Sequence, residues 1–396
     1  MTSNGWASVP LREVATQFVD RFDVQLGESY VNLGVKWYAE GVFAREPKLG
    51  SSIKAKNLYR VRPGQFIYNR MFATEGSFAL VRDAHADGVV SNEFPVFDLD
   101  RTRLLPDFLA LHFQQPAVWE RVAQECVGTT KSRSRWKEDR FLAYELPLPP
   151  LAEQHRIVDL IGSLDDAIMD AISFETAIVR LRSALVSNAV HGQPLRLMSD
   201  LVEVSQGKSL PSRFQSIQTG NFPWFKIADM TTPSNLDGYQ VAATYMTEEE
   251  ILQRGGRVVS VGSVVFPRVG AAVLTEKKRI MDVPGALDEN HIILSPKAGT
   301  HPEFLLGVME GIRLSDLAQS GAVPSLNMGL IRRLEVPWAE EGKQEDVAAV
   351  LASLRSTLTR ARNLAGDLRS LRRELLSALL SGAHRIPETY GELMGA

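Results

Sequence analysis

The sequence lacks several features that define whole classes of protein. It has a single cysteine, Cys126, in 396 residues, so neither an internal disulfide nor a thiolate metal cluster can form. No run of 18 apolar residues occurs, and we therefore expect no membrane-spanning helix and no membrane partner. The first fifteen residues lack the basic and apolar regions of a secretory signal peptide. These absences predict a protein of a reducing compartment, the cytoplasm.

The chain also lacks a strong charge of either sign and the motifs of familiar catalytic sites. A net charge of −3 argues against a uniformly basic nucleic-acid coat, so any contact with nucleic acid would come from local patches. Neither the Gly-x-Gly-x-x-Gly fingerprint nor the Asn/Asp-Pro-Pro-aromatic motif of amino-methyltransferases occurs. The stretch ending in Gly207-Lys208-Ser209 resembles part of a P-loop, but Val202 occupies the position of the first glycine. The seven histidines are scattered, and we expect no catalytic residue, cofactor or metal site in this chain.

What the sequence does contain is an internal repeat. The run ELPLPPLAEQHRIVDLIGSL begins at Glu145 and returns in degenerate form as EVPWAEEGKQEDVAAVLASL at Glu335, an offset of 190 residues (335 − 145). Shorter blocks repeat as well: PGQFIYNR aligns with VGSVVFPR, and PDFLAL aligns with PEFLLG. The offset drifts between these blocks, so the scaffold is shared while the loops differ in length. Variable loops on a common scaffold are where different specificities would be built.

This repeat predicts an α+β protein with two similar mixed α/β domains, separated by an antiparallel two-helix coiled coil with a pseudo-twofold axis. Short apolar stretches bounded by Gly, Asn and Pro predict strands at 65–68, 78–81 and 94–97, and a helical stretch follows at 106–126. The expected divisions are a first domain at 1–145, a central helix at 146–192, a second domain at 193–336, a C-terminal helix at 337–383 and a tail at 384–396.

The two long helices carry apolar residues at alternating spacings of three and four. In the first helix these are Ile157, Leu160, Leu164, Ala167, Ala171, Phe174, Ile178, Leu181 and Leu185. In the second they are Val347, Val350, Leu354, Thr357, Ala361, Leu364, Leu368, Leu371 and Leu375. Four sustained heptads predict a coiled coil, and we expect these positions to form its core. Antiparallel pairing is favoured over parallel pairing because it preserves the pseudo-twofold.

The run LPLPPLAEQHRIV followed by heptads resembles the conserved boundary motif of type I restriction–modification specificity subunits. PGQFIYNRMFATEGSFALV, GVVSNEFPVFDLD, GSVVFPRVGAA and VPSLNMGLIRRLEVP are similar to segments of that family's recognition domains, so the resemblance covers nearly the whole chain. It implies the order target-recognition domain, helix, target-recognition domain, helix. The second copy of the motif, VPWAEEGKQEDV, departs from the family pattern because it keeps Pro337 and Gln344 but loses the Pro-Pro-Leu core.

The resemblance further implies a non-catalytic subunit that reads a bipartite sequence in double-stranded DNA. Its helices would fix the gap between the half-sites and dock two DNA-methyltransferase subunits, and through them restriction/translocase subunits. S-adenosylmethionine and ATP with Mg would bind those partners, not this chain. Three alternatives remain open: a coiled-coil scaffold for proteins, a DNA-recognition subunit of a related defence system, and an enzyme with an unrecognised site.

Local basic patches supply the candidates for DNA contact, because cations neutralise phosphates and Arg or Asn side chains read base edges. The candidates are Arg45, Lys48, Lys54, Lys56, Arg70, Lys131, Arg133, Arg135, Lys137, Lys208, Arg268, Lys277, Lys278 and Asn327. Charge runs are commonly solvated faces, and Arg70 and Arg268 each end an apolar strand, where an ion-pair role is an equal alternative. Trp136 is expected to pack rather than stack on a base. Gln154 is expected either to hydrogen-bond the backbone at the helix start or to contact the methyltransferase.

Overall fold

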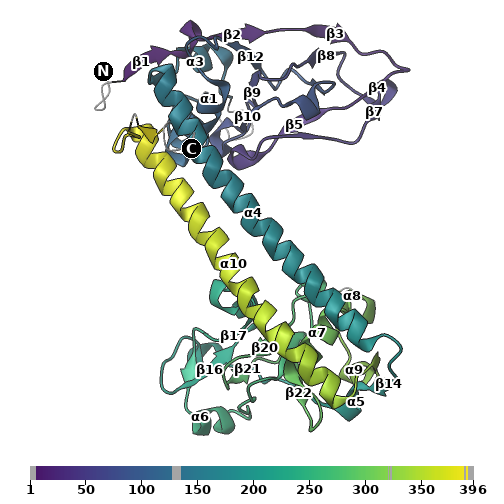
Figure 1. Ribbon diagram of the computed structural model, residues 1–396. Helices are drawn as coiled ribbons and strands as arrows, with labels where there is room; N and C mark the ends of the chain where they lie inside the picture. Colours follow the sequence, from purple (N-terminus) through teal and green to yellow (C-terminus); the bar gives the residue numbers. More distant parts are fainter. Residues whose placement is uncertain (1–5, 127–134, 320, 322, 388, 391–396) are drawn as a thin grey trace. The chain divides into compact units, whose positions relative to one another are not determined.

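The computed structural model describes residues 6–126, 135–319, 321, 323–387 and 389–390. The chain forms two compact units, Met1–Ile168 with Leu368–Ala396, and Met169–Asp367. Both boundaries fall inside a long helix, α4 (Leu151–Val190) or α10 (Glu341–Ser381) (Figure 1). Each unit therefore contains one mixed α/β domain and a segment of both long helices. Within the described ranges, no helix is long and apolar enough to cross a membrane.

The first domain is built on a four-stranded antiparallel sheet. Its order is β10 (Phe78–Leu80), β9 (Phe66–Tyr68), β12 (Val96–Leu99) and β2 (Ala15–Phe18). A three-stranded sheet adds β11 (Val89–Val90), β8 (Asn57–Arg60) and β3 (Arg21–Asp23). The strand pairs are β1 (Ala7–Pro10) with β13 (Glu145–Leu148), β4 (Ser29–Tyr30) with β7 (Lys48–Leu49), and β5 (Leu33–Val35) with β6 (Val42–Ala44). The strands expected at 65–68, 78–81 and 94–97 thus lie within two residues of their predicted places.

The helices of the first domain are α1 (Pro106–His112), α2 (Pro116–Glu125) and α3 (Glu138–Ala143). The single helical stretch expected at 106–126 is therefore two helices. Pro116 explains the break, because proline starts a helix readily but lacks the N–H that a helix interior needs.

An aromatic core fills the first unit. Phe97 and Phe141 have ring centroids 4.2 Å apart, and Phe78 and Phe113 have centroids 4.5 Å apart. Trp136 is fully buried in the same cluster and donates from Nε1 to Glu125 at 3.1 Å. The predicted packing role of this tryptophan is confirmed. Apolar side chains of both long helices complete this core: Ile157, Ile161, Leu376, Leu379 and Leu380.

The second domain repeats this plan with a larger sheet. Its order is β15 (Val202–Gln206), β22 (His291–Pro296), β19 (Val264–Pro267), β20 (Arg279–Met281) and β17 (Gly238–Tyr239). A smaller sheet contains β18 (Tyr245–Met246), β16 (Phe222–Phe225) and β21 (Ala286–Leu287), and β14 (Leu195–Leu197) pairs with β23 (Glu335–Pro337). The helices are α5 (Met198–Leu201), α6 (Glu248–Gln253), α7 (Pro302–Glu310), α8 (Leu314–Leu317) and α9 (Met328–Arg332).

One buried glutamine anchors each domain on its long helix. The Gln154 amide donates to the carbonyls of Arg103 and Pro149 at 2.8 and 2.9 Å, and its oxygen accepts from Leu105 N–H at 2.8 Å. Gln344 makes the equivalent bonds to Gly299, Ala339 and His301 at 3.2, 2.9 and 3.0 Å. Because Leu105 and His301 are the N-cap residues of α1 and α7, each glutamine ties a domain helix to a long helix. The hydrogen bond expected from Gln154 to the backbone at the helix start is confirmed.

Within each unit the two long-helix segments are paired antiparallel. In the second unit, Glu175 pairs with Arg362 at 2.7 Å, and Arg182 donates to the carbonyl of Leu351 at 2.7 Å. In the first unit, Asp165 pairs with Arg372 at 2.5 Å while Ile157 packs with the Leu376–Leu380 turn. As residue numbers rise along α4, the numbers of their partners on α10 fall, so the predicted antiparallel pairing is confirmed within each unit. The helices begin at residues 151 and 341 rather than 146 and 337, because β13 and β23 precede them.

Of the two heptad positions predicted to form the helix core, one is wrong. Ile161 and Ile168 are buried and Arg182 is 3% exposed, whereas the predicted core residues Phe174 and Leu181 are 53% and 47% exposed. The same shift by one residue occurs on α10, where three predicted core residues are about half exposed: Val350, Leu364 and Leu371. The polar side chains at the true core positions explain the error. Arg182 is buried, and Glu175 and Arg372 are partly buried in the ion pairs described above.

Candidate nucleic-acid interface

In the first domain, three segments that are distant in sequence meet at Arg70, directly after β9. The Arg70 backbone N–H donates to the carbonyl of Glu93 at 3.0 Å, and its carbonyl accepts from the N–H of Trp136 at 3.1 Å. Lys137 follows at the N-cap of α3 and is exposed. We name this meeting point the first strand-end junction.

The second domain has the same arrangement after β19. The Arg268 backbone N–H donates to the carbonyl of Asn290 at 2.7 Å, and its carbonyl accepts from the N–H of Leu326 at 2.8 Å. Asn327 follows at the N-cap of α9, where its side chain accepts from the N–H of Gly329 at 2.7 Å and stays exposed. This is the second strand-end junction.

The two junctions share a backbone frame but present different side chains. Lys137 places a point charge suited to phosphate where Asn327 places an amide, a group that pairs with adenine edges. Lys208 is exposed and lies near the second junction, since the N–H of its neighbour Gly207 donates to the carbonyl of His291 at 3.4 Å and its own N–H donates to the carbonyl of Leu287 at 2.8 Å. Two candidates of each domain thus lie at equivalent places. Arg70 and Arg268 were already paired by the repeat, and the structure adds the correspondence of Lys137 with Asn327.

The junction arginines themselves are engaged within the protein. Arg70 forms an ion pair with Glu138, and both side chains are 22% exposed. Arg268 donates from Nε to the carbonyl of Glu289 at 2.9 Å. Arg135 pairs with Glu93 at 3.0 Å. These contacts favour the structural alternative for Arg70 and Arg268, which hold the junctions in shape.

A buried hydrogen-bonded chain supports the second junction. His291 is fully buried, with Nδ1 2.8 Å from an Asp288 carboxylate oxygen and Nε2 2.7 Å from the Tyr239 hydroxyl. Burial raises the pKa of Tyr239 well above its usual value. Burial opposes ionisation of Asp288, but the hydrogen bond and charge of His291, together with backbone N–H donors that include Asn290, outweigh it and lower the pKa of that carboxyl. This chain fixes the loop that carries the Asn290 carbonyl to Arg268.

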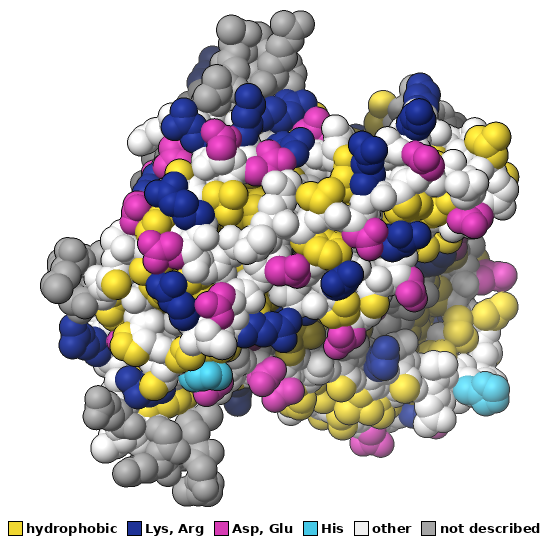
Figure 2. All heavy atoms as spheres, turned by 90° about the horizontal axis from the view of Figure 1, so that it is seen from above, with side chains coloured by type: hydrophobic (Ala, Val, Ile, Leu, Met, Phe, Trp, Pro, Cys, Tyr) yellow, Lys and Arg dark blue, Asp and Glu magenta, His cyan; other side chains and the backbone are white. Residues whose placement is uncertain are grey.

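The basic stretch of the first domain divides into two kinds of residue. Its Arg45 guanidinium lies 5.4 Å from the centre of the Phe43 ring. Its lysines, Lys48, Lys54 and Lys56, are exposed, and none of the three forms an ion pair with another described residue. These lysines are available to phosphates. On the face drawn in Figure 2, Lys and Arg side chains are interspersed with acidic and hydrophobic ones, so contact there would be local, not spread over a uniform basic surface.

Two predicted contacts in the second domain do not fit an open surface. Lys278 is 8% exposed, pairs with Glu276 at 3.3 Å and donates to the carbonyl of Ile312 at 2.7 Å. Burial lowers the pKa of its ammonium. It occupies the core position that Phe78 fills in the first domain, so we leave it out of the interface. Lys277 beside it is half-buried. Lys131 and Arg133 lie outside the described residues.

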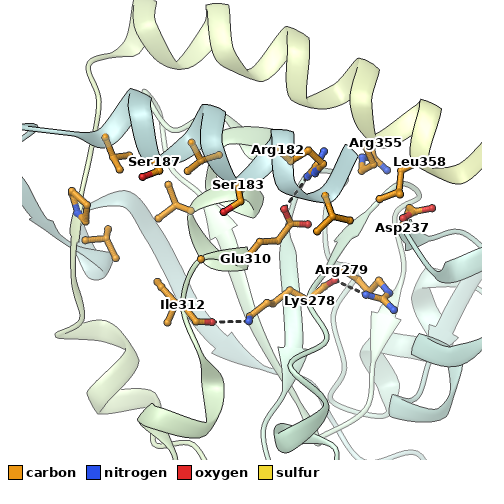
Figure 3. Close-up of a pocket in the computed structure, with 18 of the residues that line it drawn as sticks. Arg182, Ser183, Ser187, Asp237, Lys278, Arg279, Glu310, Ile312, Arg355 and Leu358 are labelled. Carbon is orange, nitrogen blue, oxygen red and sulfur yellow. Dashed lines mark hydrogen bonds and ion pairs between the residues drawn. The ribbon is translucent and has the colours of Figure 1, made fainter. Parts of the chain in front are cut away.

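A cavity of about 920 Å³ lies in the second unit where α4 and α10 cover the end of α7 (Figure 3). Charged groups in its lining are engaged with other groups of the protein. Arg182 pairs with Glu310 at 3.1 Å, and Arg279 donates to the carbonyls of Lys278 and Met230 at 2.8 and 2.9 Å. The cavity therefore lies where the long helices pack on the second domain. No cluster of three metal-ligating His, Cys, Asp or Glu side chains occurs in the part of the chain that the structure describes.

Sequence reasoning missed the exposed apolar row on the long helices. The positions that turn inward instead carry charged residues, which hydropathy ranks as solvent-facing: Glu175, Arg182 and Arg372. Sequence reasoning also missed the exposed aromatic turn at Trp37–Tyr38, for which the sequence offers no periodic or charge pattern.

No protein-family model matches the chain. Among curated proteins, it is 22% identical over 167 residues to the type I restriction enzyme MjaIX specificity subunit of Methanocaldococcus jannaschii. That match covers 40% of this chain, and the chain spans 37% of the relative's length.

Two solved structures extend the likeness to nearly the whole chain. The type I restriction–modification S subunit from M. genitalium has a TM-score of 0.60 at 13% identity, covering 96% of this chain and 99% of that one. A chain from a structural study of complex assembly and conformational transition of the type I R-M system has a TM-score of 0.54 at 16% identity, covering 96% and 98%. The resemblance found in the residues is confirmed: the chain is similar to a type I specificity subunit in sequence and shares the fold of the S subunit.

Proposed function

We propose that this chain is the DNA-specificity subunit of a type I restriction–modification system, without catalytic activity of its own. Each domain reads one half of a bipartite sequence in double-stranded DNA. The observation that carries this proposal is the pair of strand-end junctions, whose backbone frames match while Lys137 in one corresponds to Asn327 in the other. Matching backbone geometry that carries different side chains suits two half-sites of different sequence.

The partners follow from a second repeated feature. Phe174 on α4 corresponds to Leu364 on α10, and both are 53% exposed; Leu181 corresponds to Leu371, at 47% and 49%. We call these four exposed apolar positions, with Val350, the outer row. Exposed apolar side chains that recur in register indicate protein contact. Two equivalent rows suit two copies of one partner, which we identify as DNA-methyltransferase subunits.

The remaining chemistry belongs to those partners. Adenine methylation would use S-adenosylmethionine on the methyltransferase subunits, while ATP with Mg would serve restriction/translocase subunits that join through them. The assembly acts on DNA in the cytoplasm. In this proposal α4 and α10 set the gap between half-sites. Deleting one heptad from each helix removes roughly 10 Å at about 1.5 Å per residue and is expected to shorten the tolerated gap by a few base pairs.

The test is footprinting and methylation with the reconstituted complex. The methyltransferase subunits with this chain are expected to protect two separated DNA segments and to methylate a defined motif. Lys137→Ala is expected to relax base preference or weaken binding in one half only. Asn327→Ser, which keeps an N-cap hydroxyl for α9, is expected to act on the other half only.

The same two variants distinguish a DNA-specificity subunit from a scaffold that only holds proteins together. A scaffold would leave the methylated motif unchanged in both variants while the complex still assembles. One short, continuous footprint, or turnover by the purified chain alone, would contradict the proposal.

A further inference from the structure

A strained turn in the first domain leaves two aromatic side chains about half exposed. The Trp37 ring centroid lies 5.4 Å from that of Phe72, and the Tyr38 ring centroid lies 6.0 Å from that of Trp119. The turn Trp37–Ala39 joins β5 to β6, and its residues Tyr38 and Ala39 have φ angles of 57° and 55°. Consecutive L-residues in the left-handed region are uncommon, because the side chain crowds the backbone. Trp37 is 47% exposed and Tyr38 is 63% exposed, so burial does not offset this strain. Such strain persists where surrounding contacts impose it, often at functional positions.

Backbone contacts fix the turn to the first strand-end junction. The Ala39 N–H donates to the carbonyl of Gly76 at 2.7 Å, and the Ser77 hydroxyl donates to the carbonyl of Val35 at 2.8 Å. Asn69, the neighbour of Arg70, donates from its backbone N–H to Ser77 at 3.0 Å. The exposed aromatic pair is therefore built into the same frame as the proposed DNA contacts.

A pocket of about 430 Å³ opens beside the turn. Aromatic rings make up much of its lining: Trp37, Tyr38, Phe43, Phe72 and Phe94. Lys36 and Arg45 add positive charge against one carboxylate, Glu40. Asn69 also lines it; because its side-chain oxygen accepts from the Met71 N–H at 3.0 Å, its amide NH₂ is the group left to donate to a ligand. Flat apolar walls, a hydrogen-bond donor and nearby cations are the chemistry of a nucleobase with its phosphate.

We propose that the Trp37–Tyr38 turn and this pocket form a base-stacking site, which takes a base of the DNA where the stack is opened. This inference rests on the proposed function and adds the residues through which the first domain contacts an unstacked base. Apolar wedges of this kind open base steps in other DNA-binding proteins. The site lies on the first domain alone, so it acts on one half of the bipartite sequence.

The test uses the complex reconstituted with methyltransferase subunits and duplexes carrying its methylation motif, with 2-aminopurine placed at one position at a time. With the unaltered chain, we expect 2-aminopurine to brighten at one position in the half read by the first domain, the neighbour of the extracted base, because it loses a stacking partner there. Trp37→Ala and Tyr38→Ala are each expected to abolish that signal and weaken binding roughly five- to 100-fold. Trp37→Phe should retain part of both. Leu26→Ala is the control, because Leu26 is a 72% exposed apolar residue of the same domain.

The outcomes separate the two proposals. Binding and 2-aminopurine signals unchanged in both Ala variants, with the complex intact, overturn the base-stacking site and leave the proposed function standing. Loss of methyltransferase subunits from the variants also overturns it, since the turn would then be a protein contact. If the unaltered complex binds no bipartite motif, the proposed function itself fails. Should Trp37→Ala misfold, Tyr38→Ala decides, because its side chain is the more exposed.

Discussion

The two domains share one anchor to the long helices and differ in a second. Gln154 and Gln344 make the same three hydrogen bonds. The ion pairs differ: Arg372 holds the first unit through Asp165, whose side chain is 48% exposed, and through Gln114 at 2.9 Å. In the second unit, Arg355 binds Asp282 at 3.0 Å and Glu303 at 2.7 Å, and the Glu303 side chain is 9% exposed.

The cores of the two domains also differ in their polar groups. In the first domain, His112 is buried with Nε2 2.8 Å from the Tyr144 hydroxyl. The equivalent positions in the second domain are Val308 and Leu334, both part of an apolar cluster. Duplication has therefore preserved the contacts that attach a domain to its helix, while the polar chemistry around them has diverged. The next four predictions test that contrast.

The largest effect is expected from the ion pairs. Arg355→Met leaves two carboxylates near the core without a cation, and we expect the second unit to lose about 3 kcal/mol of unfolding free energy. The matched variant, Arg372→Met, frees the more exposed Asp165 and should cost the first unit about 1 kcal/mol. Hydrogen exchange on peptides from each unit measures both. Equal losses would show that the two attachments do not differ.

The glutamine anchors are expected to behave alike. Gln154→Leu and Gln344→Leu each strand buried backbone groups, at a cost of about 2 kcal/mol to the corresponding unit. The control is the opposite unit in each variant, whose exchange should not change. Losses that differ by more than a factor of two would break the equivalence that the repeat implies.

Acid sensitivity is expected to separate the domains. Burial lowers the pKa of His112 to about 3, so below its usual pKa of about 6.5 the unfolded chain takes up a proton that the folded chain excludes. The first unit therefore retains its unfolding free energy at pH 7 and loses about 2 kcal/mol of it by pH 5. His112→Val, which copies the second domain, should remove this loss. A pH profile that the substitution leaves unchanged would contradict the assignment.

The smallest effect on stability is expected from the outer row. Leu181→Ser and Leu371→Ser replace half-exposed side chains and should change the unfolding free energy by less than about 0.5 kcal/mol. Each should nevertheless weaken capture of methyltransferase subunits in a pull-down. Ser183→Ala, on an exposed neighbour of the same helix, is the control. If a chain carrying both Leu181→Ser and Leu371→Ser still captures methyltransferase subunits undiminished, the outer row is excluded as the docking surface.

The sequence predicted what the repeat and periodicity encode. The alignment of Arg70 with Arg268 placed both residues at equivalent backbone sites, and the heptads predicted a paired helix. The pairing register could not be predicted, because ranking residues by hydropathy puts Phe174 and Leu181 inside and Arg182 outside. Only the three-dimensional contacts show that Arg182 bonds to Leu351 and Glu310 within its unit.

The candidate DNA contacts were less predictable than the scaffold. Lys278 looks like a surface cation in the sequence because it stands between Lys277 and Arg279, yet it replaces an aromatic core residue of the other domain. Trp37 and Tyr38 carry no charge and follow no period, so no pattern singled them out. Whether a side chain is exposed depends on turns that distant segments fix, as the contact between Ala39 and Gly76 does here.

The central claim is that two domains on one chain sample DNA at two separated places. Methylome sequencing of a host that expresses this chain with its methyltransferase partners tests it most directly. The account predicts a methylated motif with two defined halves of different sequence, separated by a gap of fixed length and no base preference. A single uninterrupted motif, or methylation that does not depend on this chain, would contradict it.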